Sequence, residues 1–198
     1  MIRLSENSVL NIKNKSFSVT AEVVAPDGPL NGTIIAQGGA IGGWSFYTRD
    51  GRAKFAYNLL GIQTFTTEAI ESVPAGTHQV RVEFAYHGGG YAKGGAVSLY
   101  YDGQKVGEGR VGATQPFIFS ADEGLDVGRE TGTTVATDYD VDASAFTGQL
   151  NWVELKIGQD DHSHMVDPQD TSTCSWPANR RPPQAEIPAD AHSRILRP

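Results

Sequence analysis

Hydrophobic and polar residues alternate along much of this chain, in short segments separated by turn-forming residues. In residues 16–25 the apolar side chains Phe17, Val19, Ala21 and Val23 fall on one face. A period of two predicts a β-strand with one buried face. The same reasoning predicts further strands over 33–37, 44–48, 53–58, 62–67, 77–86, 97–101, 104–111 and 149–157. A sustained helical period appears in no window of the sequence.

The connections between these segments are typical of antiparallel hairpins. Asp50-Gly51 and Asp102-Gly103 are the residue pairs that accept positive φ in a two-residue hairpin turn. Two longer glycine-rich loops, 38–43 and 87–95, cannot form strand interiors, and glycine permits the tight bends that such loops need. Many short strands with frequent turns predict an all-β fold, a jelly-roll sandwich.

Glycine and proline divide the chain near residue 158. All 23 glycines lie at or before Gly158, whereas six of the ten prolines follow it. The last part also lacks a periodic apolar pattern, so it cannot bury enough surface to offset the entropy of ordering it. We therefore expect a β-sandwich domain over 8–158 and a largely disordered, proline-rich tail over 159–198, with a linker or an extension lying on a partner domain as the alternative.

Several short motifs, in a fixed order, carry a resemblance to a known family. They are Ile35-Ala36-Gln37-Gly38-Gly39, Gly42-Gly43-Trp44-Ser45, residues 80–86, 93–111, Leu125-Asp126-Val127-Gly128-Arg129 and Phe146-Thr147-Gly148. Together they resemble the domain that follows the catalytic domain in long bacterial arylsulfatases. This resemblance covers roughly residues 8–158 and implies a concanavalin-like, laminin G-like β-sandwich.

The resemblance carries over no catalytic residue. Sulfatases use the motif Cys-x-Pro-x-Arg, and the single cysteine, Cys174, is followed by Ser175-Trp176-Pro177-Ala178, which lacks the proline and the arginine at the required offsets. The Gly-x-Ser-x-Gly elbow and the alternating acidic strand of glycosidases are missing too. We expect no catalytic residues and no enzymatic activity from this chain alone.

An acidic, glycine-containing segment is the most suggestive candidate for a metal site. Its carboxylates include Asp122, Asp126, Asp138 and Asp140. Hard cations such as Ca²⁺ take several carboxylate and carbonyl oxygens from flexible loops, and laminin G-like sandwiches often hold calcium on such a rim. The alternative is a solvated acidic rim with Asp126 paired to Arg129. Related domains often have Asp where this chain has Glu130, which weakens a ligand role at that position.

Aromatic residues beside the glycine-rich loops are candidates for ligand or partner contact. Trp44 follows the first loop, and Tyr91 lies in the second with Lys93 as its one charged residue. We expect both loops to lie near one another at one end of the sandwich, where small residues and aromatics favour a protein interface. A sugar-binding rim would also need Asn, Asp or Arg beside the aromatics, and the second loop offers few. For Trp44 itself, a place in the core is favoured over a ligand platform.

Three functions remain open at this point. The first is an accessory module that packs on a sulfatase catalytic domain or on a second copy of itself. The second is a carbohydrate-binding, lectin-like protein. The third is an enzyme, either a divergent glycosidase or a sulfatase subunit that is a sulfate-ester hydrolase by family name only. The net charge of −7 argues against nucleic acid and anionic membranes as partners. Without an apolar leader, the chain alone predicts a cytoplasmic location, or a periplasmic one if it belongs to a longer secreted protein.

Overall fold

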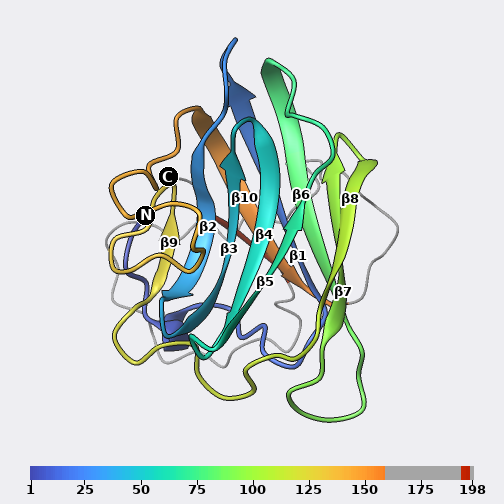
Figure 1. Cartoon of the computed structure of the whole chain (residues 1–198), viewed down its shortest axis with the longest axis vertical. Helices are drawn as coiled ribbons and strands as arrows, with labels where there is room; N and C mark the ends of the chain where they lie inside the picture. Colours follow the sequence, from blue (N-terminus) through green and yellow to red (C-terminus); the bar gives the residue numbers. More distant parts are fainter. Residues whose placement is uncertain (159–192, 197–198) are drawn as a thin grey trace, which may run out of the picture.

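Two antiparallel sheets packed face to face make up this protein. The computed structural model describes residues 1–158 and 193–196. One sheet has the order β11-β10-β1-β6-β7-β8 and the other β5-β4-β3-β2-β9 (Figure 1). The strands are β1 (Phe17–Ala25), β2 (Gly32–Gly39), β3 (Gly42–Arg49), β4 (Arg52–Leu59), β5 (Gln63–Glu68), β6 (Gly76–Tyr86), β7 (Gly95–Tyr101), β8 (Gln104–Val111), β9 (Leu125–Val127), β10 (Gln149–Ile157) and β11 (Ser193–Leu196), with one 3₁₀ turn, η1 (Glu6–Ser8).

The core lies between the two sheets and is built from the alternating apolar positions. Val19, Ala21 and Val23 of β1 are fully buried. Across the interface the ring of Phe17 packs against Trp44 of β3, with ring centroids 5.6 Å apart. Burial of apolar surface is the dominant favourable contribution to folding, and aromatic side chains bury a large area each. The predicted all-β sandwich is therefore confirmed, and its inward faces are those that the period of two predicted.

The two Asp-Gly pairs form the predicted hairpin turns. Both residues of each pair have positive φ: 51° and 82° at Asp50-Gly51, 47° and 78° at Asp102-Gly103. Positive φ at both central residues defines the type I′ turn, whose twist matches that of the strands it joins. This local chemistry fixes the β3–β4 and β7–β8 registers.

Two strands were not predicted from the sequence. The three-residue β9 pairs with β2 and is too short to show a period. β11 pairs with β10, Val153 opposite Leu196 and Lys156 opposite Ser193, so the segment predicted to be largely disordered contributes these four residues to the sheet. The physical reason is that β10 without β11 would present unpaired backbone groups along the edge of its sheet. The rest of the predicted tail, including Cys174, lies outside the described residues.

Helices contribute little to this structure. Within residues 1–158 and 193–196, no helix is long and apolar enough to cross a membrane.

Candidate functional site at the loop end

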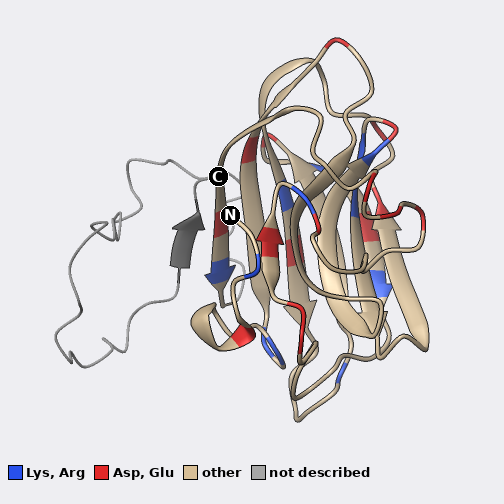
Figure 2. Ribbon diagram, turned by 90° about the vertical axis from the view of Figure 1, so that its left-hand side faces the viewer, with Lys and Arg blue, Asp and Glu red and all other residues tan. Residues whose placement is uncertain are grey.

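Strand direction brings several connections to one end of the sandwich, which we call the loop end. It comprises the β2–β3 turn at 40–41, the β4–β5 turn at 60–62, the β6–β7 loop at 87–94 and the segment 112–124 that follows β8. The loop end is the lower end of the molecule in Figure 1, and η1 lies there too. Figure 2 shows that its loop tips are mostly uncharged.

Two asparagines fasten the loop end together. The side-chain amide of Asn58 donates to the carbonyls of Gly39 and Ala40 at 3.2 and 3.0 Å, and its oxygen accepts from Gly61 N at 2.9 Å. This links the two turns of the five-stranded sheet. The backbone N–H groups and carbonyls of tight turns need such partners when they are shielded from water.

Asn14 performs the same task for the longer connections. Its side-chain oxygen accepts from Ala92 N at 3.0 Å, and its amide donates to the carbonyl of Pro116 at 3.0 Å. The Thr114 hydroxyl donates to the carbonyl of Lys93 at 2.7 Å. Segment 112–124 therefore contacts the β6–β7 loop, and the carbonyl of Phe119 also lies next to Gly42. Both glycine-rich loops lie at the same end, as the sequence predicted.

Large apolar side chains project into solvent at this end. Ile41 is 76% exposed, Ile62 81%, Tyr91 74% and Phe117 76%. The rings of Tyr91 and Phe117 lie 6.4 Å apart, and Leu60 and Ile118 are exposed as well. Single exposed apolar residues are ordinary, but several on neighbouring loops mark an interaction surface. Of the three predicted contact residues, Tyr91 and Lys93 are exposed here.

Trp44 does not belong to this surface. Its side chain is fully buried between the sheets, and its indole N–H donates to the side-chain oxygen of Gln37 at 3.1 Å. The core alternative thus holds for Trp44, because its inward position on β3 alternates with outward Ser45. It offers no area to a partner or to a sugar.

The acidic segment does not converge on one point. Asp126 is buried in β9, where one carboxylate oxygen accepts from Thr131 N and Thr131 Oγ1 at 2.8 and 2.7 Å and the other from Arg3 N. These donors, and not Arg129, are its partners among the described residues. Asp122 is exposed, and Asp140 accepts from Ala143 N at 3.0 Å.

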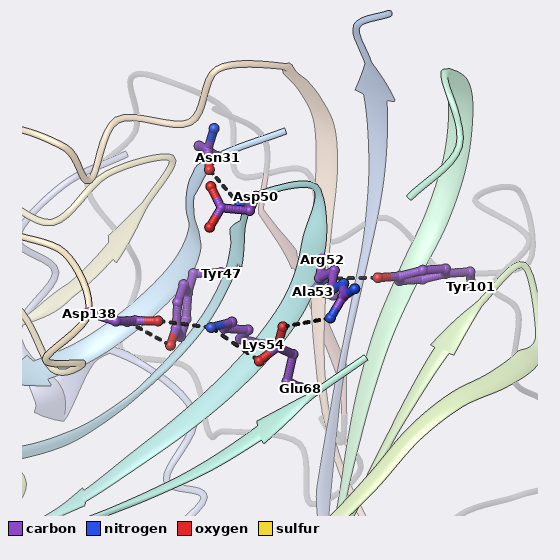
Figure 3. A network of polar contacts seen from close by, with 9 residues as sticks. All are labelled: Asn31, Tyr47, Asp50, Arg52, Ala53, Lys54, Glu68, Tyr101 and Asp138. Atoms are coloured by element: carbon purple, nitrogen blue, oxygen red, sulfur yellow. Dashed lines mark hydrogen bonds and ion pairs between the residues drawn. The ribbon is translucent and has the colours of Figure 1, made fainter. Parts of the chain in front are cut away.

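Asp138 lies on the outer face of the five-stranded sheet, in a network of charged side chains. Its carboxylate accepts from Tyr47 Oη at 2.9 Å and from Lys54 Nζ at 3.1 Å, and Lys54 also pairs with Glu68 at 3.3 Å (Figure 3). Although partial burial lowers the pKa of Lys54, its hydrogen bonds to Asp138 and Glu68 raise it overall. Within residues 1–158, no three His, Cys, Asp or Glu side chains gather as a metal site would need. The calcium site stays a prediction.

A buried carboxylate, Glu130, is the feature that sequence reasoning missed. It is 2% exposed and accepts hydrogen bonds from Thr33 Oγ1 at 3.1 Å, Ser45 Oγ at 3.3 Å and Val135 N at 2.8 Å, and another from Tyr139 Oη. Burial raises its pKa. Its partners Thr33 and Ser45 lie on β2 and β3, far from Glu130 in the chain, so nothing in the local sequence signalled this role. Glu130 therefore holds the 129–146 segment onto the outer face of the sheet.

Solved structures of other proteins share this fold. A candidate carbohydrate-binding protein from Bacteroides ovatus aligns with a TM-score of 0.53 at 14% identity, over 79% of this chain and 41% of its own. Domains LG4-5 of the mouse laminin α1 chain align with a TM-score of 0.53 at 15% identity, over 81% of this chain and 40% of theirs. This chain thus spans about two fifths of either. No family model and no curated protein sequence matches it. At this identity the likeness shows the fold alone: a laminin G-like β-sandwich.

Proposed function

We propose that this chain is a non-catalytic accessory β-sandwich module that packs through its loop end against a catalytic domain of the sulfatase type. The observation that carries the proposal is the group of exposed apolar side chains on adjoining turns, led by Ile41 and Ile62. Rigid turns that present aliphatic and aromatic side chains supply contact area at low entropic cost. The choice of a sulfatase domain as partner comes from the sequence resemblance.

The proposal is tested by measuring the affinity of the full chain for a purified sulfatase catalytic domain by biolayer interferometry. The few side chains that dominate an interface cluster near its centre and cost more than about 1 kcal/mol each when they are truncated. The double variant Ile41→Asn/Ile62→Asn should therefore bind at least about tenfold more weakly. Ile70→Asn is the matched control, because Ile70 is 73% exposed but follows β5 at the opposite end.

Three results would count against this function. If the double variant binds as tightly as wild type, the interface lies on another surface of the molecule. Absence of binding, with a concentration-dependent dimer in sedimentation that the double variant abolishes, would make a second copy the partner. If the chain neither binds the catalytic domain nor dimerises, the loop end is not a protein interface.

A second candidate function, carbohydrate binding, is favoured by a different observation. Segment 112–124 and the N-terminal residues enclose a groove in which Asn and charged side chains stand beside Phe117. Such polar groups next to an aromatic ring are what a sugar site needs and what the β6–β7 loop alone lacks. The Bacteroides ovatus protein with this fold is itself described as a candidate carbohydrate-binding protein.

A further inference from the structure

A groove runs between the N-terminal segment and residues 117–124. It consists of two adjoining hollows of about 280 and 210 Å³, which share Glu6, Asn7 and Ile118 as lining residues. Phe117, Asn11 and Lys13 complete the first hollow, and Arg3, Asp122 and Glu123 belong to the second. Together they fall within the lower part of the range of volumes that small-molecule sites occupy in proteins.

A buried ion pair gives the groove a fixed wall. The ammonium of Lys13 pairs with the Glu6 carboxylate, and both side chains are largely shielded, at 8% and 12% exposure. The second oxygen of Glu6 accepts from Phe119 N at 3.1 Å, and Lys13 Nζ lies 5.0 Å from the centre of the Phe119 ring. These contacts tie the N-terminal segment to segment 117–124, so the groove does not depend on a ligand for its shape.

In the first hollow, where Lys13 and Glu6 pair with each other, the groups that remain for a ligand are neutral amides and one flat ring. Within the described residues the Asn7 side chain has no hydrogen-bond partner, and Asn11 uses only its oxygen, which accepts from Lys13 N at 3.1 Å. Both asparagines are exposed, as is the ring of Phe117. An amide both donates and accepts, as a sugar hydroxyl does. An exposed aromatic face suits the apolar C–H side of a sugar ring, because that contact takes both surfaces out of water.

Charge decides which class of sugar the groove suits. Its lining holds two cations, Arg3 and Lys13, and three carboxylates, Glu6, Asp122 and Glu123, an excess of one negative charge. Lys13 is already neutralised by Glu6, and the whole chain carries −7. A sulfated or uronic saccharide would meet repulsion here, whereas a neutral one would not.

We propose that this groove binds a neutral oligosaccharide, with one sugar ring stacked on Phe117 and its hydroxyls hydrogen-bonded by Asn7 and Asn11. The inference rests on the second candidate function and adds its site, its contacts and its class of sugar. It requires nothing of Ile41 and Ile62, so it stands or falls separately from the protein interface.

The test is isothermal titration of the full chain with cellohexaose, maltohexaose, mannohexaose and a heparin-derived hexasaccharide. We expect at least one neutral probe to bind and the sulfated probe to bind more weakly. Phe117→Ala and Asn7→Ala should each weaken binding at least about tenfold, the equivalent of 1.4 kcal/mol, and Phe117→Trp should retain it. Ile62→Ala is the control, because Ile62 is a similarly exposed apolar residue that does not line the groove, whereas the ring of Tyr91 lies next to that of Phe117.

The outcomes separate the site from the function. Neutral binding that survives both Phe117→Ala and Asn7→Ala would overturn the groove while leaving carbohydrate binding in place. Binding of no neutral probe at millimolar concentration would overturn both. Stronger binding of the sulfated probe would overturn the charge argument. Since Phe117 and Asn7 are exposed, their variants should keep the wild-type melting temperature in a thermal unfolding scan.

Discussion

Replacing Glu130 should show how much of the stability depends on one buried carboxylate. In Glu130→Ala the hydroxyls of Ser45 and Tyr139, 3.0 Å apart, can still bond to each other, and Thr33 Oγ1 lies 3.3 Å from Tyr139 Oη. Val135 N–H has no such substitute, because its bond goes to the other Glu130 oxygen. One orphaned buried donor predicts a loss of about 1–3 kcal/mol in the free energy of unfolding.

Glutamine at position 130 provides the matched control. Its oxygen can accept from Val135 N while its amide donates to the hydroxyl oxygens, so Glu130→Gln should cost much less than Glu130→Ala. It also removes the charge. Burial raises the folded-state pKa of Glu130 above its ordinary value of 4.5, so the folded protein holds this proton more tightly than the unfolded chain does. The stabilisation is present in full below pH 4.5 and is lost as pH rises through the folded pKa.

The assay is urea unfolding followed by intrinsic fluorescence, in steps from pH 4 to pH 7. Between pH 4 and pH 7 the free energy of unfolding should fall more for wild type than for Glu130→Gln, which has no titrating group at this position. The reasoning would be refuted if Glu130→Ala matched wild type within about 0.5 kcal/mol, the scatter expected of surface substitutions. A pH dependence shared by wild type and Glu130→Gln would refute the titration part alone.

Three further predictions concern other parts of the sandwich. The hydrogen bond that the His78 ring donates to the Asp102 carboxylate raises the pKa of His78. The stability that this bond contributes is therefore present below pH 6.5 and is lost as pH rises through the folded pKa, and NMR titration should show a lower His78 pKa in Asp102→Asn. Gly32 has φ of 105°, and a Cβ there would lie 2.3 Å from the carbonyl oxygen of Ala145. Gly32→Ala should therefore lower the free energy of unfolding by about 2 kcal/mol or more in urea. Gly28→Ala is the control and should be nearly neutral, because a Cβ at Gly28 would have no atom within 4 Å. Calcium near Asp126 predicts a melting temperature that rises with Ca²⁺ and falls with chelator; a response unchanged in Asp126→Asn would exclude that location.

The sequence by itself determined nine of the eleven described strands and the two Asp-Gly hairpins. Alternation in 16–25 and in 77–86 placed Val19 and Val82 inside, and Asp50-Gly51 and Asp102-Gly103 formed the turns that their chemistry favours. These signals are local: each depends on residues within one strand or one turn, whose geometry sets the period and the allowed φ.

Only the tertiary structure decided the contacts between segments that lie far apart in the chain. Glu130 meets Thr33 and Ser45 because the 129–146 segment folds back over the sheet. Likewise Glu6 of the N-terminal segment reaches Phe119 N, 113 residues away, and so places Asn7 in a groove that Phe117 also lines. Among chain neighbours, few hydrogen-bonding groups stand beside the loop aromatics. Strand order and loop closure bring further hydrogen-bonding groups next to them from distant parts of the chain. Such contacts carry no periodic signature, because their partners are chosen by the packing of the whole sandwich.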